Sequence, residues 1–149
     1  MPTTIYFSGS ITGGRNDVPL YRRLVAALEE DGHRVLAGAV AAEDVSDGGE
    51  GLQRAEIFAR DLAWLDAADV VVAEVSMPSL GVGYEIAYAR YARRIPVICL
   101  WRPAYARRCS AMIAGDSGIE LIEYENPEAM IPRLLESVRR LPRSPDRLP

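Results

Sequence analysis

Glu85 is the first candidate for chemistry in this sequence. It lies in the segment MPSLGVGYEIAYA, residues 77–89, where two glycines precede it and the most apolar run of the chain comes just before. The helix dipole favours the ionised form of a carboxylate near the start of a helix, and beside an anion-binding loop such a group could act as a nucleophile. Taken alone, Glu85 is explained more simply as a charge that caps a helix.

A second carboxylate and a tyrosine would favour a catalytic role for Glu85 if their side chains lie beside it in the folded protein. Asp61, in FARDLAWLDAAD, is flanked by apolar positions and lies three residues before Trp64, so we expect it to face partly inward. Tyr6 lies in a predicted strand and could point into the site, although a core tyrosine is the simpler explanation. Glycosyl transfer uses such a set, because one carboxylate attacks the sugar carbon while an acid assists the departing base.

The residue types that are missing narrow the chemistry further. All seventeen basic residues are arginine, so Schiff-base catalysis and a P-loop lysine are excluded. The single histidine, His33, lies in a predicted connector, which makes a histidine-based triad improbable. Cys99 and Cys109 have no metal-ligand spacing, and we interpret them as ordinary reduced thiols without a metal. Carboxylates, tyrosines and serines remain for proton transfer and nucleophilic attack.

Chain length and net charge limit the number of domains and the kinds of partner that we expect. The 149 residues fit one domain, which we assign to residues 1–141, with a disordered tail at 142–149. The net charge of −4 and the scattered arginines give no continuous basic stripe, so no nucleic-acid polymer is expected as a partner. Because no apolar run approaches the length of a membrane span and no signal peptide is evident, we expect a cytoplasmic protein without a membrane partner.

Hydrophobic periodicity predicts alternating strands and helices. Strands are expected at 4–10, 33–40, 70–75, 95–101 and 118–124, and helices at 17–32, 52–69, 84–94 and 127–140. In the second of these helices, the side chains expected to face inward are Leu52, Ile57, Leu62 and Leu65. Such alternation indicates a single α/β domain with a five-stranded parallel sheet, helices on both faces and a flavodoxin- or Rossmann-like strand order 2-1-3-4-5.

In a sheet of this order, ligands bind beyond the carboxyl ends of strands one and three. The segments SGSITGG and SMPSLGVG would meet there, and their glycines would let backbone N–H groups approach a phosphate. Neither segment fits the Rossmann fingerprint well, and a purely structural turn is about as good an explanation. The candidate substrate and phosphate contacts here are Ser8, Gly9, Ser10, Ile11, Gly14, Arg15, Ser79 and Gly81.

The segments IYFSGSITGG, DLAWLDAADVVVAEVSMPSLGVGYEIAYA and RRCSAMIAG resemble the 2'-deoxynucleoside 5'-phosphate N-hydrolase family, within the nucleoside 2-deoxyribosyltransferase superfamily. The resemblance runs from about Ile5 to Ile122. It implies that the N-glycosidic bond of a nucleoside 5'-monophosphate is cleaved to free base and deoxyribose 5-phosphate, without a metal or organic cofactor. Glu85 matches the family nucleophile, Asp61 matches an aspartate that positions the sugar or leaving base, and Tyr6 matches the active-site tyrosine.

The resemblance also implies a phosphate site that two subunits share. Gly9, Ser79 and Gly81 match positions that hold the phosphate, and Ser110 matches a serine that the neighbouring subunit of a homodimer contributes. Met112, two residues further on, is counted with Ser110 among the candidate substrate and phosphate contacts. The apolar and basic mixture around Met112 suits such an interface, although these side chains could instead cover the sheet edge of their own subunit.

Two departures from the family pattern concern the substrate. Thr12 stands where mammalian members have an arginine, for which Arg15 could substitute, and Ala39 stands in place of a histidine. The preference for base or sugar could therefore differ. Three alternatives stay open: a nucleoside 2-deoxyribosyltransferase that passes the sugar to a second base, a hydrolase of ribonucleotides, and a nucleotide sensor without catalysis.

Overall fold

A five-stranded parallel sheet forms the centre of the computed structural model, which describes residues 2–11, 15–41, 51–104 and 108–142. Its order is β2-β1-β3-β4-β5, and every neighbouring pair runs parallel. The predicted fold class and strand order are thereby confirmed. The strands are β1 Thr4–Gly9, β2 Arg34–Leu36, β3 Val70–Glu74, β4 Val97–Trp101 and β5 Ile119–Glu123.

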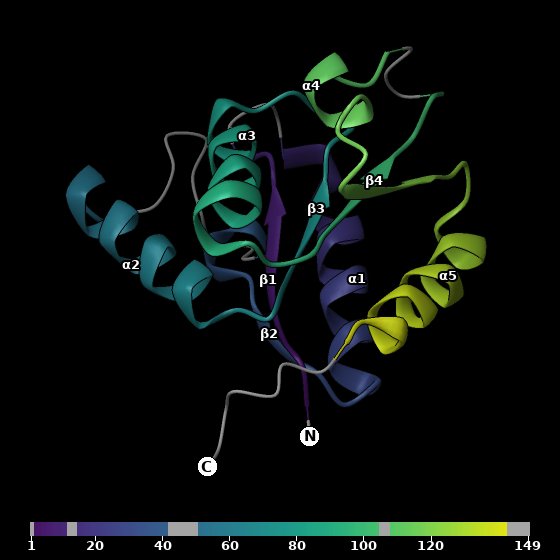
Figure 1. Ribbon diagram of the computed structural model, residues 1–149, viewed down its shortest axis with the longest axis horizontal. Coiled ribbons are helices and arrows are strands. Elements are labelled where there is room, and N and C mark those ends of the chain that lie inside the picture. The colour runs from purple at the N-terminus through teal and green to yellow at the C-terminus, as the bar shows by residue number, and fades with distance from the viewer. Residues whose placement is uncertain (1, 12–14, 42–50, 105–107, 143–149) are drawn as a thin grey trace.

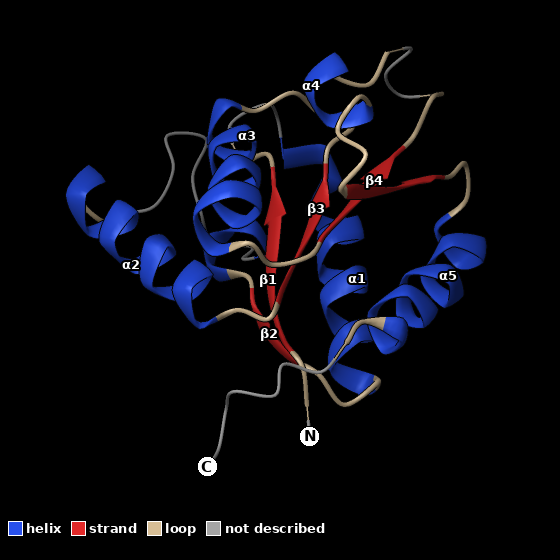
Figure 2. Ribbon diagram, in the orientation of Figure 1, coloured by secondary structure: helices blue, strands red, loops and turns tan. Residues whose placement is uncertain are grey.

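Helices cover both faces of this sheet, with α2 and α3 on one side and α1 and α5 on the other (Figures 1 and 2). The α-helices are α1 Val18–Glu30, α2 Arg54–Ala67, α3 Leu80–Ala87, α4 Ala111–Ala114 and α5 Pro127–Arg140. Two 3₁₀ turns, η1 Arg15–Asp17 and η2 Gly38–Ala41, follow β1 and β2, and a π-helical segment, η3 Tyr88–Arg93, continues α3. None of the described helices is long and apolar enough to cross a membrane.

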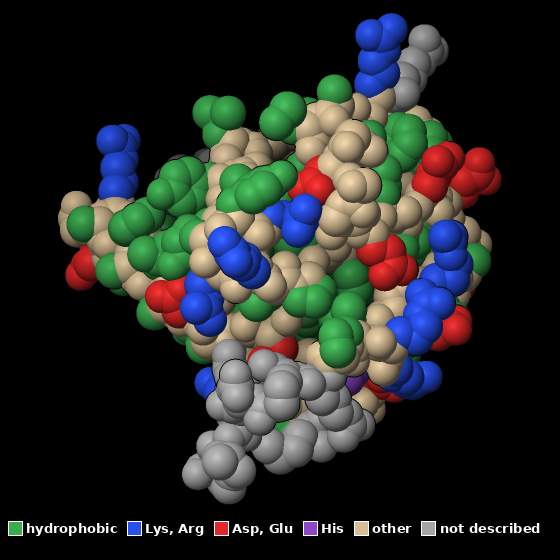
Figure 3. Space-filling view, viewed as in Figure 1, with side chains coloured by type: hydrophobic (Ala, Val, Ile, Leu, Met, Phe, Trp, Pro, Cys, Tyr) green, Lys and Arg blue, Asp and Glu red, His purple; other side chains and the backbone are tan. Residues whose placement is uncertain are grey.

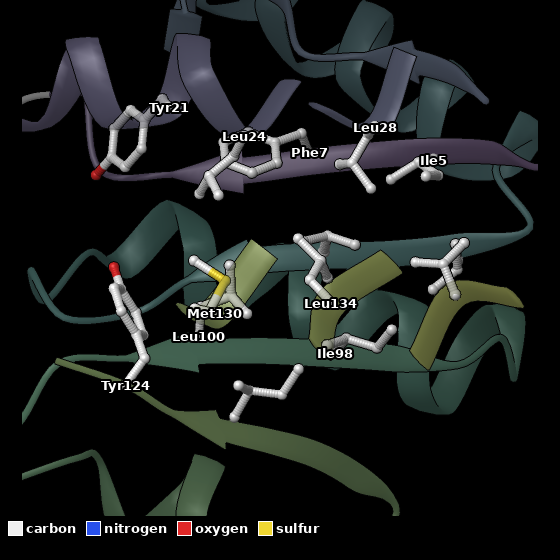
Figure 4. Packing of buried hydrophobic residues seen from close by; sticks show 14 residues of the cluster. Ile5, Phe7, Tyr21, Leu24, Leu28, Ile98, Leu100, Tyr124, Met130 and Leu134 are labelled. Atoms are coloured by element: carbon white, nitrogen blue, oxygen red, sulfur yellow. The ribbon is translucent and has the colours of Figure 1, made fainter. Parts of the chain in front are cut away.

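The sheet separates two apolar clusters because successive strand residues point to opposite faces. Ile5 and Phe7 of β1 belong to the cluster under α1 and α5, which Figure 4 shows with Leu24 and Leu134 from those helices. Tyr6 points to the other face and packs in the cluster under α2 and α3. The alternation along β1 therefore decides which of its side chains can face a site beside α3.

Several predicted boundaries were wrong. The second strand ends at Leu36 and is followed by η2, and Leu52 is exposed and precedes α2 instead of facing inward. The helix predicted from residue 84 begins at Leu80, because the Ser79 side chain caps it by accepting a hydrogen bond of 3.3 Å from the Val82 backbone N–H. The segment that looked like a glycine loop is thus the first turn of a helix.

Candidate active site

Glu85 of α3 faces Tyr6 and Ser8, which lie two residues apart on one face of β1. The Tyr6 hydroxyl donates a hydrogen bond of 3.0 Å to Glu85 Oε1, and the Ser8 hydroxyl donates one to Oε2. Both carboxylate oxygens are therefore held by side chains of a single strand. The structure brings Tyr6 and Glu85 together as the sequence predicted, and it places Ser8 at the carboxylate.

The surroundings of Glu85 act on its pKa in opposite directions. Burial raises the pKa most, hydrogen bonds from Ser8 and Tyr6 lower it, and the charge of Asp61 raises it again. The net direction is upward. Glu85 lies beyond the first turn of α3, farther from the helix start than the sequence predicted, so the helix dipole acts on it less strongly than expected. The pKa of Tyr6 is raised by burial and by Glu85, so Tyr6 stays a neutral donor.

Asp61 of α2 lies within electrostatic range of this pair, because its charge raises the pKa of both Glu85 and Tyr6. Its Oδ1 accepts hydrogen bonds from Arg60 Nε at 2.9 Å and from Arg60 Nη2 at 2.8 Å. Tyr6 and Glu85 of the predicted set are thus in direct contact, and Asp61 acts on both through its charge, next to an arginine that was not among the predicted site residues.

The carboxyl end of β1 supplies a second polar group on the same face. Ser10 is 4% exposed, and its hydroxyl has no hydrogen-bond partner among the residues that the structure describes. Ser79 lies at the start of α3, where backbone N–H groups of the first turn, including that of Gly81, are suited to an anion. The two segments that the sequence predicts to hold a phosphate thus contain a buried hydroxyl after β1 and a helix N-terminus at Ser79.

The remaining residues that the sequence predicted as substrate contacts, or discussed beside them, are not all described at the site. Gly9 ends β1 on the opposite face, where an added Cβ would come within 2.9 Å of the Tyr21 ring, so packing alone explains a glycine there. Ile11 follows Ser10 and is half-buried. Gly14, Thr12 and the side chains of Arg15 and Ala39 lie outside the part of the chain that the structure describes.

A cavity of about 890 Å³ lies between α3 and α4. Ser79 and Ser110 both line it, together with Met112, which is 83% exposed. Glu85, Tyr6 and Asp61 are not among its lining residues. Within one chain, Ser79 and Ser110 therefore border a common hollow beside the proposed phosphate end of the site.

A further buried carboxylate lies on the other face of the sheet. Glu74 is 1% exposed; it accepts hydrogen bonds from the Ser76 backbone N–H at 2.7 Å and the Tyr124 hydroxyl at 3.3 Å. Arg102 pairs with Glu74 at 3.4 Å and with Asp17 at 2.7 Å. Burial raises the pKa of Glu74. This cluster ties the start of α1 to the ends of β3 and β4, and the sequence analysis did not predict it.

The two cysteines lie apart from Glu85. Cys99 and Cys109 are free, and burial raises the pKa of both thiols. No group of three or more His, Cys, Asp and Glu side chains in the described ranges is placed to hold a metal ion.

Sheet order and site together define a doubly wound α/β protein with a carboxylate site over its first strand. A CMP N-glycosidase from Clostridium botulinum has the same fold, with a TM-score of 0.65 and 16% sequence identity over 88% of this chain and 97% of that one. Residues 5–126 match the family described as nucleoside 2-deoxyribosyltransferase, and the chain belongs to that family.

Curated relatives are considerably more similar in sequence. A mouse (Mus musculus) protein named 5-hydroxymethyl-dUMP N-hydrolase is 45% identical over 144 residues, which is 92% of this chain and 82% of the relative. A protein from Methanosarcina mazei, provisionally named 2'-deoxynucleoside 5'-phosphate N-hydrolase 1, is 41% identical over 140 residues, 93% of this chain and 85% of the relative. The resemblance that the sequence motifs indicated is thus confirmed.

Proposed function

We propose that this enzyme hydrolyses the N-glycosidic bond of 2'-deoxynucleoside 5'-monophosphates, with Glu85 as the nucleophile. The observation that carries the proposal is the placement of the Glu85 carboxylate, whose two oxygens accept hydrogen bonds from Tyr6 and Ser8. These two donors stabilise the ionised form against burial, and a nucleophile must be ionised. The names of the curated relatives support the reaction and the substrate class.

The reaction proceeds in two steps. One Glu85 oxygen attacks C1' of the sugar, the bond from C1' to the base nitrogen breaks, and the base leaves with the electron pair and takes up a proton. Water then attacks C1' and gives up a proton, which balances the one taken up by the base. The ester bond to Glu85 breaks, and deoxyribose 5-phosphate leaves as the carboxylate is restored. Asp61 positions the sugar or the leaving base beside Glu85, and Tyr6 keeps the nucleophile aligned.

The phosphate is proposed to lie at the start of α3. The Ser10 hydroxyl, buried without a described partner, and the N-terminal N–H groups of α3 beside Ser79 and Gly81 support this position. Gly9, Ile11, Gly14 and Arg15 stay predicted contacts. Removing the 5'-phosphate from a good substrate should cost much of kcat/KM, because a remote charged group helps to hold the sugar against the carboxylate. Equal activity on the bare nucleoside would contradict a phosphate site.

We further propose that the working unit is a homodimer in which Ser110 of one chain completes the phosphate site of the other. Large hydrophobic side chains are exposed around α3 and α4, and Figure 3 shows such side chains gathered over α2 and α3. Leu80 is 96% exposed, and an exposed apolar surface of this kind favours association with a second copy. The exposed large hydrophobic residues are Leu52, just before α2, and Phe58, Leu80, Tyr84, Tyr91 and Met112.

Mixing two inactive variants tests whether Ser110 acts across subunits or within its own chain, where it borders the same cavity as Ser79. Glu85→Gln and Ser110→Trp should each be nearly inactive alone. In a mixed dimer with sharing, one site combines an intact Glu85 with an intact Ser110, so activity should recover to about a quarter of wild type at equal amounts. No recovery despite demonstrated subunit exchange would mean that Ser110 acts within its own chain.

The competing functions are separated by one assay. A panel of deoxyribonucleotides and ribonucleotides is incubated with the protein, and free base is followed by chromatography. Release of base in water alone supports hydrolysis, whereas release that requires an acceptor base would indicate a transferase. Binding without release would indicate a sensor. The relatives' names favour the hydrolase and a deoxy sugar. A cytoplasmic location stays a prediction from the sequence.

A further inference from the structure

The guanidinium of Arg60 is held in an unusual place for a helical arginine. Neighbouring residues of an α-helix do not face each other, yet Arg60 donates to the adjacent Asp61 through both Nε and Nη2. Its side chain must therefore lie along the surface of α2. The guanidinium lies over the ring of Trp64, one turn further along the helix, and its central carbon is 4.7 Å from the ring centroid.

The space for this arrangement comes from a glycine in η2. A Cβ added to Gly38 would lie 2.8 Å from the Trp64 ring and 3.4 Å from Arg60 Nη2, and Gly38 has a positive φ of 51°. Because Gly38 has no side chain, it leaves room for the Trp64 ring, and this ring supports the Arg60 guanidinium from the side of the sheet. With only a quarter of its side chain exposed, Arg60 is more confined than a surface arginine.

This confined cation lies beside the reacting groups. Burial raises the pKa of Tyr6 most, the charges of Glu85 and Asp61 raise it further, and the charge of Arg60 lowers it. Arg60 therefore acts within the same electrostatic environment as the Tyr6–Glu85 pair. Nε and Nη2 of Arg60 both donate to the same oxygen, Asp61 Oδ1, and this fork of two charge-assisted hydrogen bonds holds that oxygen in place.

We propose that Arg60 is a positioning residue for the hydrolysis, acting through Asp61, whose carboxylate it holds in the orientation that the sugar or leaving base requires. The inference rests on the roles proposed above for Glu85 and Asp61. A misplaced carboxylate would still let the nucleotide bind through its phosphate end. The loss of Arg60 should therefore lower kcat much more than it raises KM.

A double-mutant cycle tests this dependence on Asp61. Arg60→Gln should lower kcat about tenfold and change KM by less than about threefold. Arg60→Lys keeps the charge without the fork, so its kcat should lie between those of Arg60→Gln and wild type. In an Asp61→Asn background, Arg60→Gln should cause almost no further loss, because the group through which it acts is gone. Arg54→Gln, in the first turn of the same helix, is the matched control and should match wild type.

The outcomes separate this inference from the proposed function. If Asp61→Asn is impaired and Arg60→Gln lowers kcat by the same factor in both backgrounds, Arg60 does not act through Asp61 and the inference is overturned alone. If Asp61→Asn has wild-type kcat, the proposed role of Asp61 fails and this inference fails with it. A merely structural Arg60 would lower the melting temperature and would reduce kcat equally with and without Asp61.

Discussion

The Tyr6 hydroxyl lies 3.0 Å from Glu85 Oε1 and donates a hydrogen bond to it, across 79 positions of the chain. With Ser8 on the other oxygen, this bond lowers the pKa of Glu85, while burial raises it more strongly. The fraction of enzyme in which Glu85 is ionised is therefore set by a balance between the hydrogen bonds from β1 and the burial of the carboxylate. Changing one side of that balance should move the pH dependence of the reaction.

Tyr6→Phe removes a donor and leaves the burial of Glu85 in place. The pKa of Glu85 should rise further, and because the reaction needs the ionised carboxylate, the acidic limb of the kcat/KM profile should move to higher pH. Tyr21→Phe is the matched control, since Tyr21 packs against Phe7 on the other face of the sheet. An acidic limb that stays in place in Tyr6→Phe would show that this bond does not control the nucleophile.

Asp61→Asn should move the acidic limb in the opposite direction. The charge of Asp61 raises the pKa of Glu85, so its removal lowers that pKa and the limb shifts to lower pH. At the same time kcat should fall, because Asp61 is the group proposed to position the sugar or the leaving base. Asp66→Asn, on the exposed end of the same helix, should leave the limb unchanged. A shift of the Asp61→Asn limb to higher pH would contradict the assigned charge interaction.

Ser10→Ala separates substrate binding from stability. The Ser10 hydroxyl is buried without a described partner, so its removal should not lower the melting temperature, while KM for the nucleotide should rise roughly tenfold as one hydrogen bond to the phosphate is lost. Ser137→Ala is the converse control. Ser137 is buried and donates to Glu120 at 2.5 Å, so its loss should lower stability and leave KM unchanged. Unchanged KM in Ser10→Ala would remove Ser10 from the phosphate site.

Arg102→Leu should lower the free energy of unfolding by about 3–5 kcal/mol at neutral pH, because Glu74 and Asp17 lose their buried cation. The loss should shrink as the pH falls and Glu74, whose pKa burial raises, becomes protonated. Urea unfolding measures both effects. Arg23→Ala, which breaks an exposed pair with Glu128, should lower the free energy of unfolding much less, because solvent screens exposed ion pairs. Equal losses in the two variants would show that burial of the Arg102 cluster is not important for stability.

The parallel sheet and the pairing of Tyr6 with Glu85 could be predicted from the sequence, because both depend on strong local signals. The β-branched run of β3 and the period of two in β1 predict buried parallel strands, and the motif around Glu85 carries the family resemblance. The start of α3 was missed because Gly81 and Gly83 looked like a loop, whereas the Ser79 cap begins a helix there. Glycine propensity was outweighed by capping and by packing of α3 on the sheet.

Other features of the structure depend on contacts between residues that are adjacent or far apart in the chain. The spacing of residues in the sequence does not reveal such contacts. Tyr6 and Ser8 share one face of a strand, so their alternation could have placed Ser8 at Glu85. The Arg60–Asp61 pair gave no signal, because adjacent helical residues normally diverge. The Glu74 cluster joins three segments far apart in the chain.

The role of Glu85 as the nucleophile is tested most directly by trapping the covalent intermediate. A 2'-fluorinated nucleotide that slows the second step is incubated with the enzyme, and the protein is digested and analysed by mass spectrometry. The account predicts that the peptide containing Glu85 gains the mass of the fluorinated sugar phosphate, and that Glu85→Gln gains none. The same mass on a peptide without Glu85, in both the wild-type enzyme and Glu85→Gln, would contradict it.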